Sequence, residues 1–251
     1  MAGYVGNILV IYDIRSPTKP EEVSRWWMPG QHVAGGEEPN PEGRRHRLHH
    51  ALRFGDRLWA GCWHAGLWVI DVSDIRAPRT VGAYNYHPPF PEPSHTFMPL
   101  PSEIAGRRIA LAIDEEEQAQ NPQDLERRRG RPHGCLFVVD VTDPANMRLL
   151  SMYEVSELDS PWSRASLQRF GAHQFQEHIE DTLVYCAWFA GGMRIVDVAD
   201  PLSPREVGYF IPEPSAGKAA PQTNDVDVDG RGHIYIVDRL GGFDVLEFTG
   251  R

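Results

Sequence analysis

The sequence lacks the features that mark several large classes of protein. Its three cysteines are too few, and odd in number, for a disulfide framework. Its apolar runs have the length of strands, so no segment reads as a membrane-spanning helix. The N-terminus has no basic region followed by a long apolar stretch, which is the pattern of a signal peptide. These absences predict a cytoplasmic protein that makes no use of a membrane.

Positive charge is also scarce. The chain has 25 Lys and Arg residues against 35 Asp and Glu residues, which gives a net charge of −10. The only clearly basic run is Arg127–Arg131. Nucleic acids and anionic membranes attract proteins through basic surfaces, so neither is expected as the main partner. A small-molecule substrate is the partner that we expect, and the oligomeric state is left open.

What the chain does contain is a short apolar pattern that recurs from end to end. Its clearest copies are Gly66–Val72, Cys135–Val141 and Gly192–Val198; Ile8–Ile14 is a fourth copy and Gly242–Phe248 a degenerate fifth. The aligned acidic residues lie at positions 13, 71, 140, 197 and 247, a nearly constant spacing. Self-similarity at a steady period indicates a repeat architecture.

Each copy reads as one strand of a larger repeating unit. It is rich in Val, Ile and aromatic residues, and in the three clearest copies we expect the aspartate near its end, Asp71, Asp140 or Asp197, to cap the turn that follows. A further strand follows each of the three clearest copies, at Arg79–Tyr84, Arg148–Tyr153 and Arg205–Phe210. A pair of strands precedes three of the five copies, at Ala51–Arg53 and Arg57–Cys62, Phe175–Glu177 and Thr182–Ala187, and Val226–Asp229 and His233–Val237. That makes four antiparallel strands per unit, the blade of a β-propeller. We therefore predict an all-β fold, a single propeller domain over residues 1–251, with five blades as the favoured number.

The amino-acid sequence of the repeat resembles that of a known family. Leu67–Val72, Leu136–Val141 and Met193–Val198 are similar to the repeats of the LVIVD family of β-propellers. That resemblance implies the propeller fold but no single activity, because the family is functionally mixed. A fainter resemblance, by analogy of fold, is to selenium-binding protein and methanethiol oxidase, propellers in which histidines surround a copper site.

Histidines recur at the entry to the innermost strand of successive blades. His50, His95 and His173 occupy this position in three blades, and Asn224 and Asp225 occupy it in the fourth. In a radial fold matching positions converge on the central axis, so these imidazoles are expected to share one ion. Three histidines with an open position suit catalytic Zn²⁺, and histidine ligands also suit Cu or Fe. His49 is expected on the opposite strand face, because side chains alternate along a strand.

The loop between the second and third strands of each blade opens on the same mouth of the channel. It carries proton-transfer groups, an anion-binding group and apolar walls, the inventory of a small-molecule pocket. We predict proton transfer by His64, Asp114 and Glu115, and binding of an anionic or carbonyl oxygen by Arg239. The predicted substrate-binding residues are Trp63, Trp188, Asn224 and Asp225.

These observations favour a small-molecule enzyme with a divalent metal, Zn, Cu or Fe, that catalyses oxidation or hydrolysis. Two other interpretations remain open. The histidines can serve a metal-free His/Asp acid–base lyase or isomerase. Alternatively, they can be polar residues that line a wet channel, in a scaffold that binds protein partners and catalyses nothing.

Overall fold

A computed structural model describes residues 3–128, 130–163 and 167–250 of the chain. The chain starts with a two-stranded hairpin, β1 (Leu9–Asp13) and β2 (Glu21–Trp26). Four-stranded units follow. The first has β3 (His46–Phe54), β4 (Arg57–Trp63), β5 (Leu67–Asp71) and β6 (Arg79–Tyr84). The second has β7 (Ser94–Pro99), β8 (Ile109–Asp114), β9 (Leu136–Asp140) and β10 (Arg148–Tyr153).

The third unit and the last sheet complete the chain. The third has β11 (Gln174–Phe175), β12 (Leu183–Trp188), β13 (Gly192–Asp197) and β14 (Arg205–Phe210). The last sheet has β15 (Thr223–Val228), β16 (His233–Asp238) and β17 (Gly242–Glu247). The helical elements are α1 (Pro122–Arg128), η1 (Val33–Gly35), η2 (Gly43–Arg45), η3 (Pro144–Asn146) and η4 (Glu157–Asp159). None of the helices in the described ranges has the length and apolar character needed to cross a membrane.

The repeated pattern forms the same strand in every unit, as predicted. Copies of it become β1, β5, β9, β13 and β17, and the strands predicted after the three clearest copies are β6, β10 and β14. The aspartates that end β5 and β9 each accept a hydrogen bond from the backbone N–H two residues further on. These bonds join Asp71 to Ser73, and Asp140 to Thr142. The aspartates therefore cap the turns, the role that the repeat predicted.

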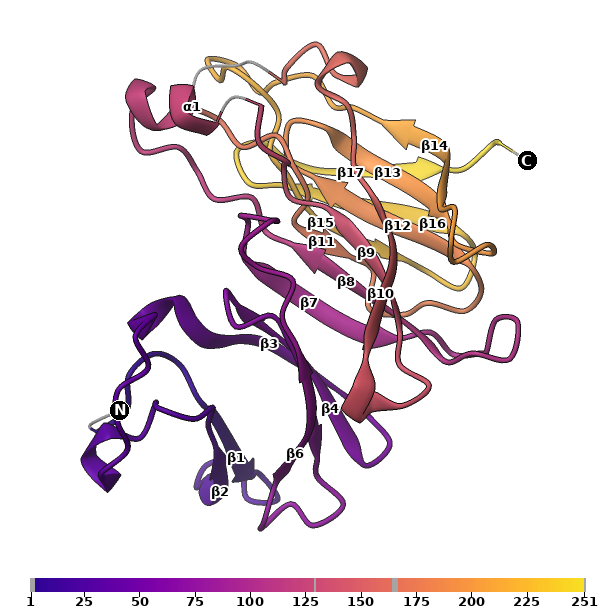
Figure 1. Cartoon of the computed structure of the whole chain (residues 1–251). Helices are drawn as coiled ribbons and strands as arrows, with labels where there is room; N and C mark the ends of the chain where they lie inside the picture. The colour runs from indigo at the N-terminus through magenta and orange to yellow at the C-terminus, as the bar shows by residue number, and fades with distance from the viewer. Residues whose placement is uncertain (1–2, 129, 164–166, 251) are drawn as a thin grey trace.

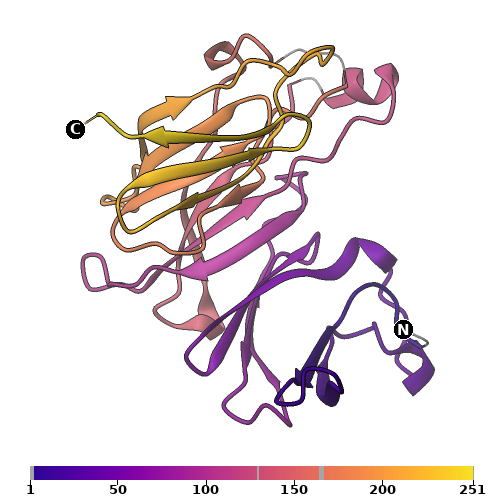
Figure 2. The same cartoon turned by 180° about the vertical axis from the view of Figure 1, so that it is seen from behind.

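The units follow one another along a curved row. β1–β2 lie at one end of the row and β15–β17 at the other, and the two views agree on this order (Figures 1 and 2). All pairing is antiparallel, and the first and second units are joined by the pairing of β4 with β7. This is a β-propeller of four-stranded blades. The number of five blades stays a prediction, because the described residues form three complete blades, a three-stranded sheet and a hairpin.

Separate apolar clusters fill the interfaces between neighbouring units. β9 shows how one strand serves two of them: Leu136 and Val138 pack toward the third unit, while Phe137 and Val139 pack toward the first. Side chains of a strand alternate between the two faces of its sheet. Because both faces of this inner blade are covered, β9 is buried at every position, and all its residues before Asp140 are apolar.

Candidate metal centre

The first strands β3, β7, β11 and β15 contact one another in sequence, and the ends of these strands at which His50, His95, His173 and Asn224 lie are called the mouth below. An irregularity in β3 brings two consecutive histidines to this mouth. The pairing of β3 with β4 shifts register between His46 and His50. A bulge of this kind re-aims side chains that would otherwise alternate. His49 Nε2 thus lies 3.7 Å from Glu115 Oε2, and His50 Nε2 lies 3.1 Å from Glu177 Oε1. His49, expected on the opposite face, is the one that faces the centre of the cluster.

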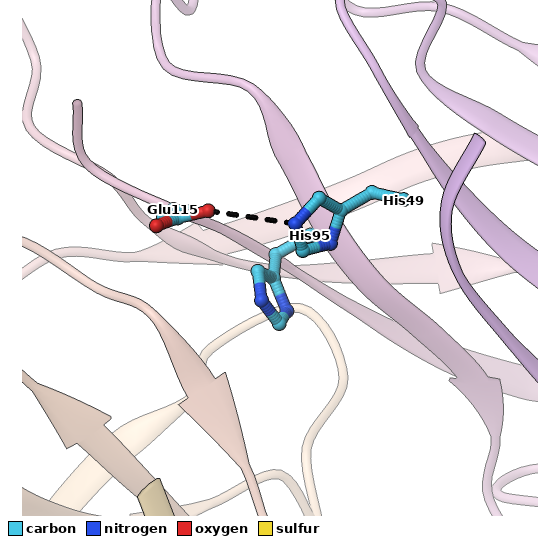
Figure 3. A group of neighbouring side chains, drawn as sticks. All are labelled: His49, His95 and Glu115. Atoms are coloured by element: carbon cyan, nitrogen blue, oxygen red, sulfur yellow. Dashed lines mark ion pairs between the residues drawn. The ribbon is translucent and has the colours of Figure 1, made fainter. Parts of the chain in front are cut away.

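His49, His95 and Glu115 form a compact group of ligand-type atoms (Figure 3). One such atom from each residue lies within 4.8 Å of the other two. The residues come from β3, from β7 and from the position directly after β8. The imidazole rings of His49 and His95 have centroids 4.3 Å apart, and those of His50 and His95 lie 5.9 Å apart.

His173 completes the group from the third blade. Its ring centroid lies 4.4 Å from that of His95, and its Nε2 lies 3.6 Å from Glu115 Oε1. Its Nδ1 donates a hydrogen bond to the backbone carbonyl oxygen of Asn224. That bond assigns the proton to Nδ1 and leaves the lone pair of Nε2 directed toward the cluster. Arg169 balances the carboxylate, with Nη1 2.8 Å from Glu115 Oε1.

The imidazoles of the cluster are held in their neutral form. Burial lowers the pKa of His173 to about 4, despite the bond to Asn224 and the nearby Glu115, which raise it. Burial also lowers the pKa of His95 well below its ordinary value, and His173 and His49 lower it further. The pKa of His49 is lowered by burial too, against the effect of Glu115. Neutral imidazole is the form that binds a metal ion or accepts a proton.

Phe189, and not Trp188, packs against His173, and the Phe189 side chain is fully buried. Arg57 in β4 pairs with Asp71, and Leu183 in β12 pairs with Asp197, so Arg57 and Leu183 are equivalent positions. Counting the same number of residues onward from each leads to Trp63 and Phe189, which are therefore structural counterparts. Both residues have positive φ, 50° for Trp63 and 22° for Phe189. The Phe189 ring lies 4.9 Å from that of His173. Trp188, one position earlier, points into the apolar cluster between the second and third blades and is fully buried there.

The remaining predicted residues fall into two groups. Asn224 and Arg239 lie at the mouth: Arg239 Nε donates to Asn224 Oδ1 at 2.7 Å. Asp225 also lies in β15, and burial followed by the charge of Glu177 raises its pKa. Trp63 lies at the edge of the cluster, with its ring centroid 5.9 Å from that of His49 and the Arg47 guanidinium 3.4 Å from its own.

His64 and Asp114 lie outside the cluster. Neither has a hydrogen bond or ion pair with the cluster among the described residues. Both ring nitrogens of His64 are buried without a hydrogen-bond partner in this part of the chain, and burial lowers its pKa to about 4. Asp114 accepts a hydrogen bond from Tyr86 Oη at 2.7 Å, and Ser94 Oγ donates to the same Tyr86 oxygen at 2.6 Å. Burial raises the pKa of Asp114 well above its ordinary value.

A pocket of about 660 Å³ opens beside the cluster, under the insertion that contains α1. Glu116 lines it; its carboxylate accepts hydrogen bonds from the backbone N–H groups of Phe170 and Gly171 and pairs with His133. Glu92 lines it as well, and burial raises the pKa of Glu92 to about 8. Glu115 therefore belongs to the cluster, whereas its neighbour Glu116 lines the pocket.

Four residues of the mouth were absent from the predicted site. His49 was assigned to the wrong face, because a bulge has no simple sequence signal. Phe189 was hidden by the neighbouring tryptophan, although counting from the repeated aspartates identifies it. Arg169 lies in a loop outside the repeat. Thr96 Oγ1, 2.7 Å from His95 Nδ1 and 3.4 Å from His50 Nδ1, had no pattern to mark it.

Comparison with known families agrees with the repeat. A family model described as the LVIVD repeat matches residues 55–86, 133–155 and 180–211. The chain carries LVIVD repeats. In this LVIVD-repeat chain the matched segments contain β4–β6, β9–β10 and β12–β14, which are the outer strands of the three complete blades.

Solved structures resemble the LVIVD-repeat chain in fold at low sequence identity. The major allergen Mala s 1 of Malassezia sympodialis matches with a TM-score of 0.52 and 12% identity, over 80% of this chain and 59% of its own. The chain thus spans 59% of the allergen's length. The β-1,2-mannobiose phosphorylase of Listeria innocua matches with a TM-score of 0.44 and 11% identity, over 93% of this chain and 72% of its own. The GH93 α-L-arabinofuranosidase of Fusarium graminearum matches with a TM-score of 0.40 and 12% identity, over 97% and 74%. No curated protein matches the LVIVD-repeat chain.

Proposed function

We propose that this chain is a small-molecule enzyme that binds a divalent metal ion at one mouth of the propeller and catalyses an oxidation or a hydrolysis. The observation that supports this proposal is the group formed by His49, His95 and Glu115, with ligand atoms within 4.8 Å of one another. Two imidazoles and one carboxylate are the donor set of zinc hydrolases and of non-haem iron oxygenases.

The geometry of the group suits an ion after small side-chain rotations. Bonds from zinc to imidazole nitrogen or carboxylate oxygen are about 2 Å long, so ligand atoms on one ion lie roughly 3 to 4 Å apart. His49 and His95 lie in strands of two neighbouring blades, and Glu115 directly follows a strand. Their backbones are therefore held in place by the sheets. Their imidazoles are neutral, so metal binding displaces no proton from them.

The predicted ligand set changes in this proposal. His95 stays a ligand, His49 takes the place predicted for His50, and Glu115 becomes a ligand rather than a proton-transfer group. His173 then has its Nε2 lone pair at the edge of the site, 3.6 Å from Glu115 Oε1, where it serves as fourth ligand or accepts a proton from the substrate or from water. A bound ion would supply Lewis acidity or, for Fe or Cu, redox chemistry.

Metal content measured by plasma mass spectrometry on tag-free protein tests the proposal. We expect about one Zn, Cu or Fe per chain, as for a single site of three or four ligands. The content is expected to fall close to zero in His49→Ala, His95→Ala and Glu115→Gln. His178, which is exposed, provides the control His178→Ala, which is expected to keep the metal. His50→Ala is expected to keep it as well.

The result that overturns the metal site is equally definite. A chain that takes up no Zn, Cu or Fe after incubation with each ion contradicts the proposal. So does a chain that keeps its metal in all three ligand variants. Either result leaves metal-free acid–base chemistry or binding of protein partners as the function of this mouth.

A further inference from the structure

Two guanidinium groups lie against one aromatic ring at the mouth. Arg169 Cζ lies 4.9 Å from the centroid of the Phe189 ring, and Arg239 Cζ lies 5.6 Å from it. Arg169 precedes β11, and Arg239 follows β16 directly. Burial lowers the pKa of Arg239, and the charge of Arg169 lowers it further. Two like charges held this close repel each other, so the arrangement favours a bound anion.

Gln222 forms hydrogen bonds with the backbones of both arginines. Its Nε2 donates a hydrogen bond to the backbone oxygen of Arg169 at 2.9 Å, and its own backbone oxygen accepts one from the N–H of Arg239 at 2.9 Å. Gln222 is buried, with 4% of its surface exposed. The Phe189 backbone is fixed as well, since its carbonyl oxygen accepts a hydrogen bond from Thr223 N–H. The two arginines are thus positioned by the fold and not by chance contacts of long side chains.

The two arginines differ in how much of their hydrogen-bonding capacity is used. Arg169 Nη1 donates to the Glu115 carboxylate. Arg239 donates through Nε to the neutral Asn224 side chain, and within residues 3–128, 130–163 and 167–250 its terminal nitrogens have no acceptor. Arg239 also has no ion pair in these ranges. Its open guanidinium edge lies at the same mouth as His173, whose pKa it helps to lower.

We propose that Arg239, assisted by Arg169, binds the carboxylate of a small organic anion at this mouth, with the reacting part of that molecule facing His95, His173 and Glu115. A guanidinium presents two parallel N–H groups that match the two oxygens of a carboxylate. Phe189 is fully buried and contacts both guanidinium groups, so it helps to hold the two arginines in place and does not itself touch the ligand. The assignment of this anion as substrate rests on the proposed function, whereas its binding does not.

Isothermal titration calorimetry with propionate, succinate and inorganic phosphate tests this site. Each probe is titrated into the full chain as purified and after removal of metal with a chelator. We expect a carboxylate to bind in both preparations, and Arg239→Gln to raise its Kd by about tenfold or more, the value of a hydrogen bond to a charged group. Arg239→Lys keeps the charge without the planar fork and is expected to recover only part of the affinity.

Arg231→Gln is the matched control. Arg231 lies in the turn between β15 and β16, in the same sheet as Arg239, and pairs with Asp229 at 2.6 Å. The Arg231→Gln substitution removes one positive charge, as Arg239→Gln does, but it is expected to leave the Kd for the carboxylate unchanged. The proposal is overturned if the wild-type chain binds neither carboxylate, if Arg239→Gln binds it as tightly as wild type does, or if phosphate is preferred to both. Carboxylate binding by a chain that takes up no metal supports this site and contradicts the metal centre alone.

Discussion

Raising the pH through the titration of His133 is expected to loosen the insertion beside the mouth. His133 Nδ1 lies 2.8 Å from Glu116 Oε2, and His133 Nε2 lies 3.2 Å from Glu157 Oε1. The backbone N–H of His133 also donates to Glu154 Oε1 at 2.9 Å, a bond that does not depend on the charge of the imidazole. The side chain of His133 is 22% exposed, so solvent screens these interactions only in part. One imidazolium thus ties the insertion to the segment after β10.

The magnitude follows from the pKa of His133. Burial lowers this pKa, but Glu116 and Glu157 outweigh burial and raise it to about 9. An unfolded chain has a histidine pKa of about 6.5, and the difference of roughly 2.5 units corresponds to at most about 3 kcal/mol. Because the folded-state pKa is the higher one, this stabilisation is complete below about pH 6.5 and is lost as the pH rises through about 9.

Urea denaturation of the wild type and of His133→Gln at about pH 6, 7.5 and 9 measures this contribution. We expect wild type to exceed the variant by up to about 3 kcal/mol at the lowest pH and by little at the highest. His178→Gln, at an exposed position, controls for the loss of an imidazole and is expected to follow wild type at each pH. A difference between wild type and His133→Gln that stays constant from pH 6 to 9 refutes the reasoning.

Two further predictions concern the blade interfaces and the support of the cluster. Gly82→Ala is expected to cost about 1–3 kcal/mol, because a Cβ there would lie 2.0 Å from the backbone oxygen of Pro144 in η3. Gly230→Ala, where nothing among the described residues lies within 4 Å, is the control; equal melting temperatures for both variants would contradict the clash. Tyr86→Phe leaves the buried Asp114 carboxyl without its donor and is expected to cost about 1–3 kcal/mol in urea denaturation. A Tyr86→Phe variant with the same urea midpoint as wild type would show that the Tyr86–Asp114 hydrogen bond contributes nothing to stability.

Most of the fold could be predicted from the sequence because several copies of the repeat carry the same strand signal. A single apolar heptad is ambiguous between a strand and a buried helix, but five aligned copies, each closed by a turn signal, are not. β6, β10 and β14 begin and end at the predicted residues. The first strands of the blades were less predictable: β11 has two residues and β3 has nine, because their lengths depend on contacts at the channel and not on the repeat.

The candidate site was predictable only in outline, since it depends on departures from the repeat. The convergence of His95 and His173 follows from radial symmetry, and their rings lie 4.4 Å apart. The exchange of His50 for His49 follows from a bulge. Between His46 and His50, β3 has two more residues than the paired part of β4, so simple alternation does not decide which side chains face the axis. Arg169 enters from a loop whose path no periodicity describes. Local pattern thus identified the mouth, whereas backbone irregularities determine which atoms meet there.

The alternation of side chains explains why Asp114 and Glu115 have different roles although they are neighbours. Ser94 and Asp114 face each other across β7 and β8 and turn inward, where Tyr86 joins them in a buried hydrogen-bonded network. His95 and Glu115, each the next residue in the chain, turn outward to the cluster. The buried network therefore fixes the backbone at two ligand positions at once. The network is satisfied only in part, because Asp114 Oδ2 has no hydrogen-bond partner among the described residues, but its bonds join the two positions next to which the proposed ligands extend.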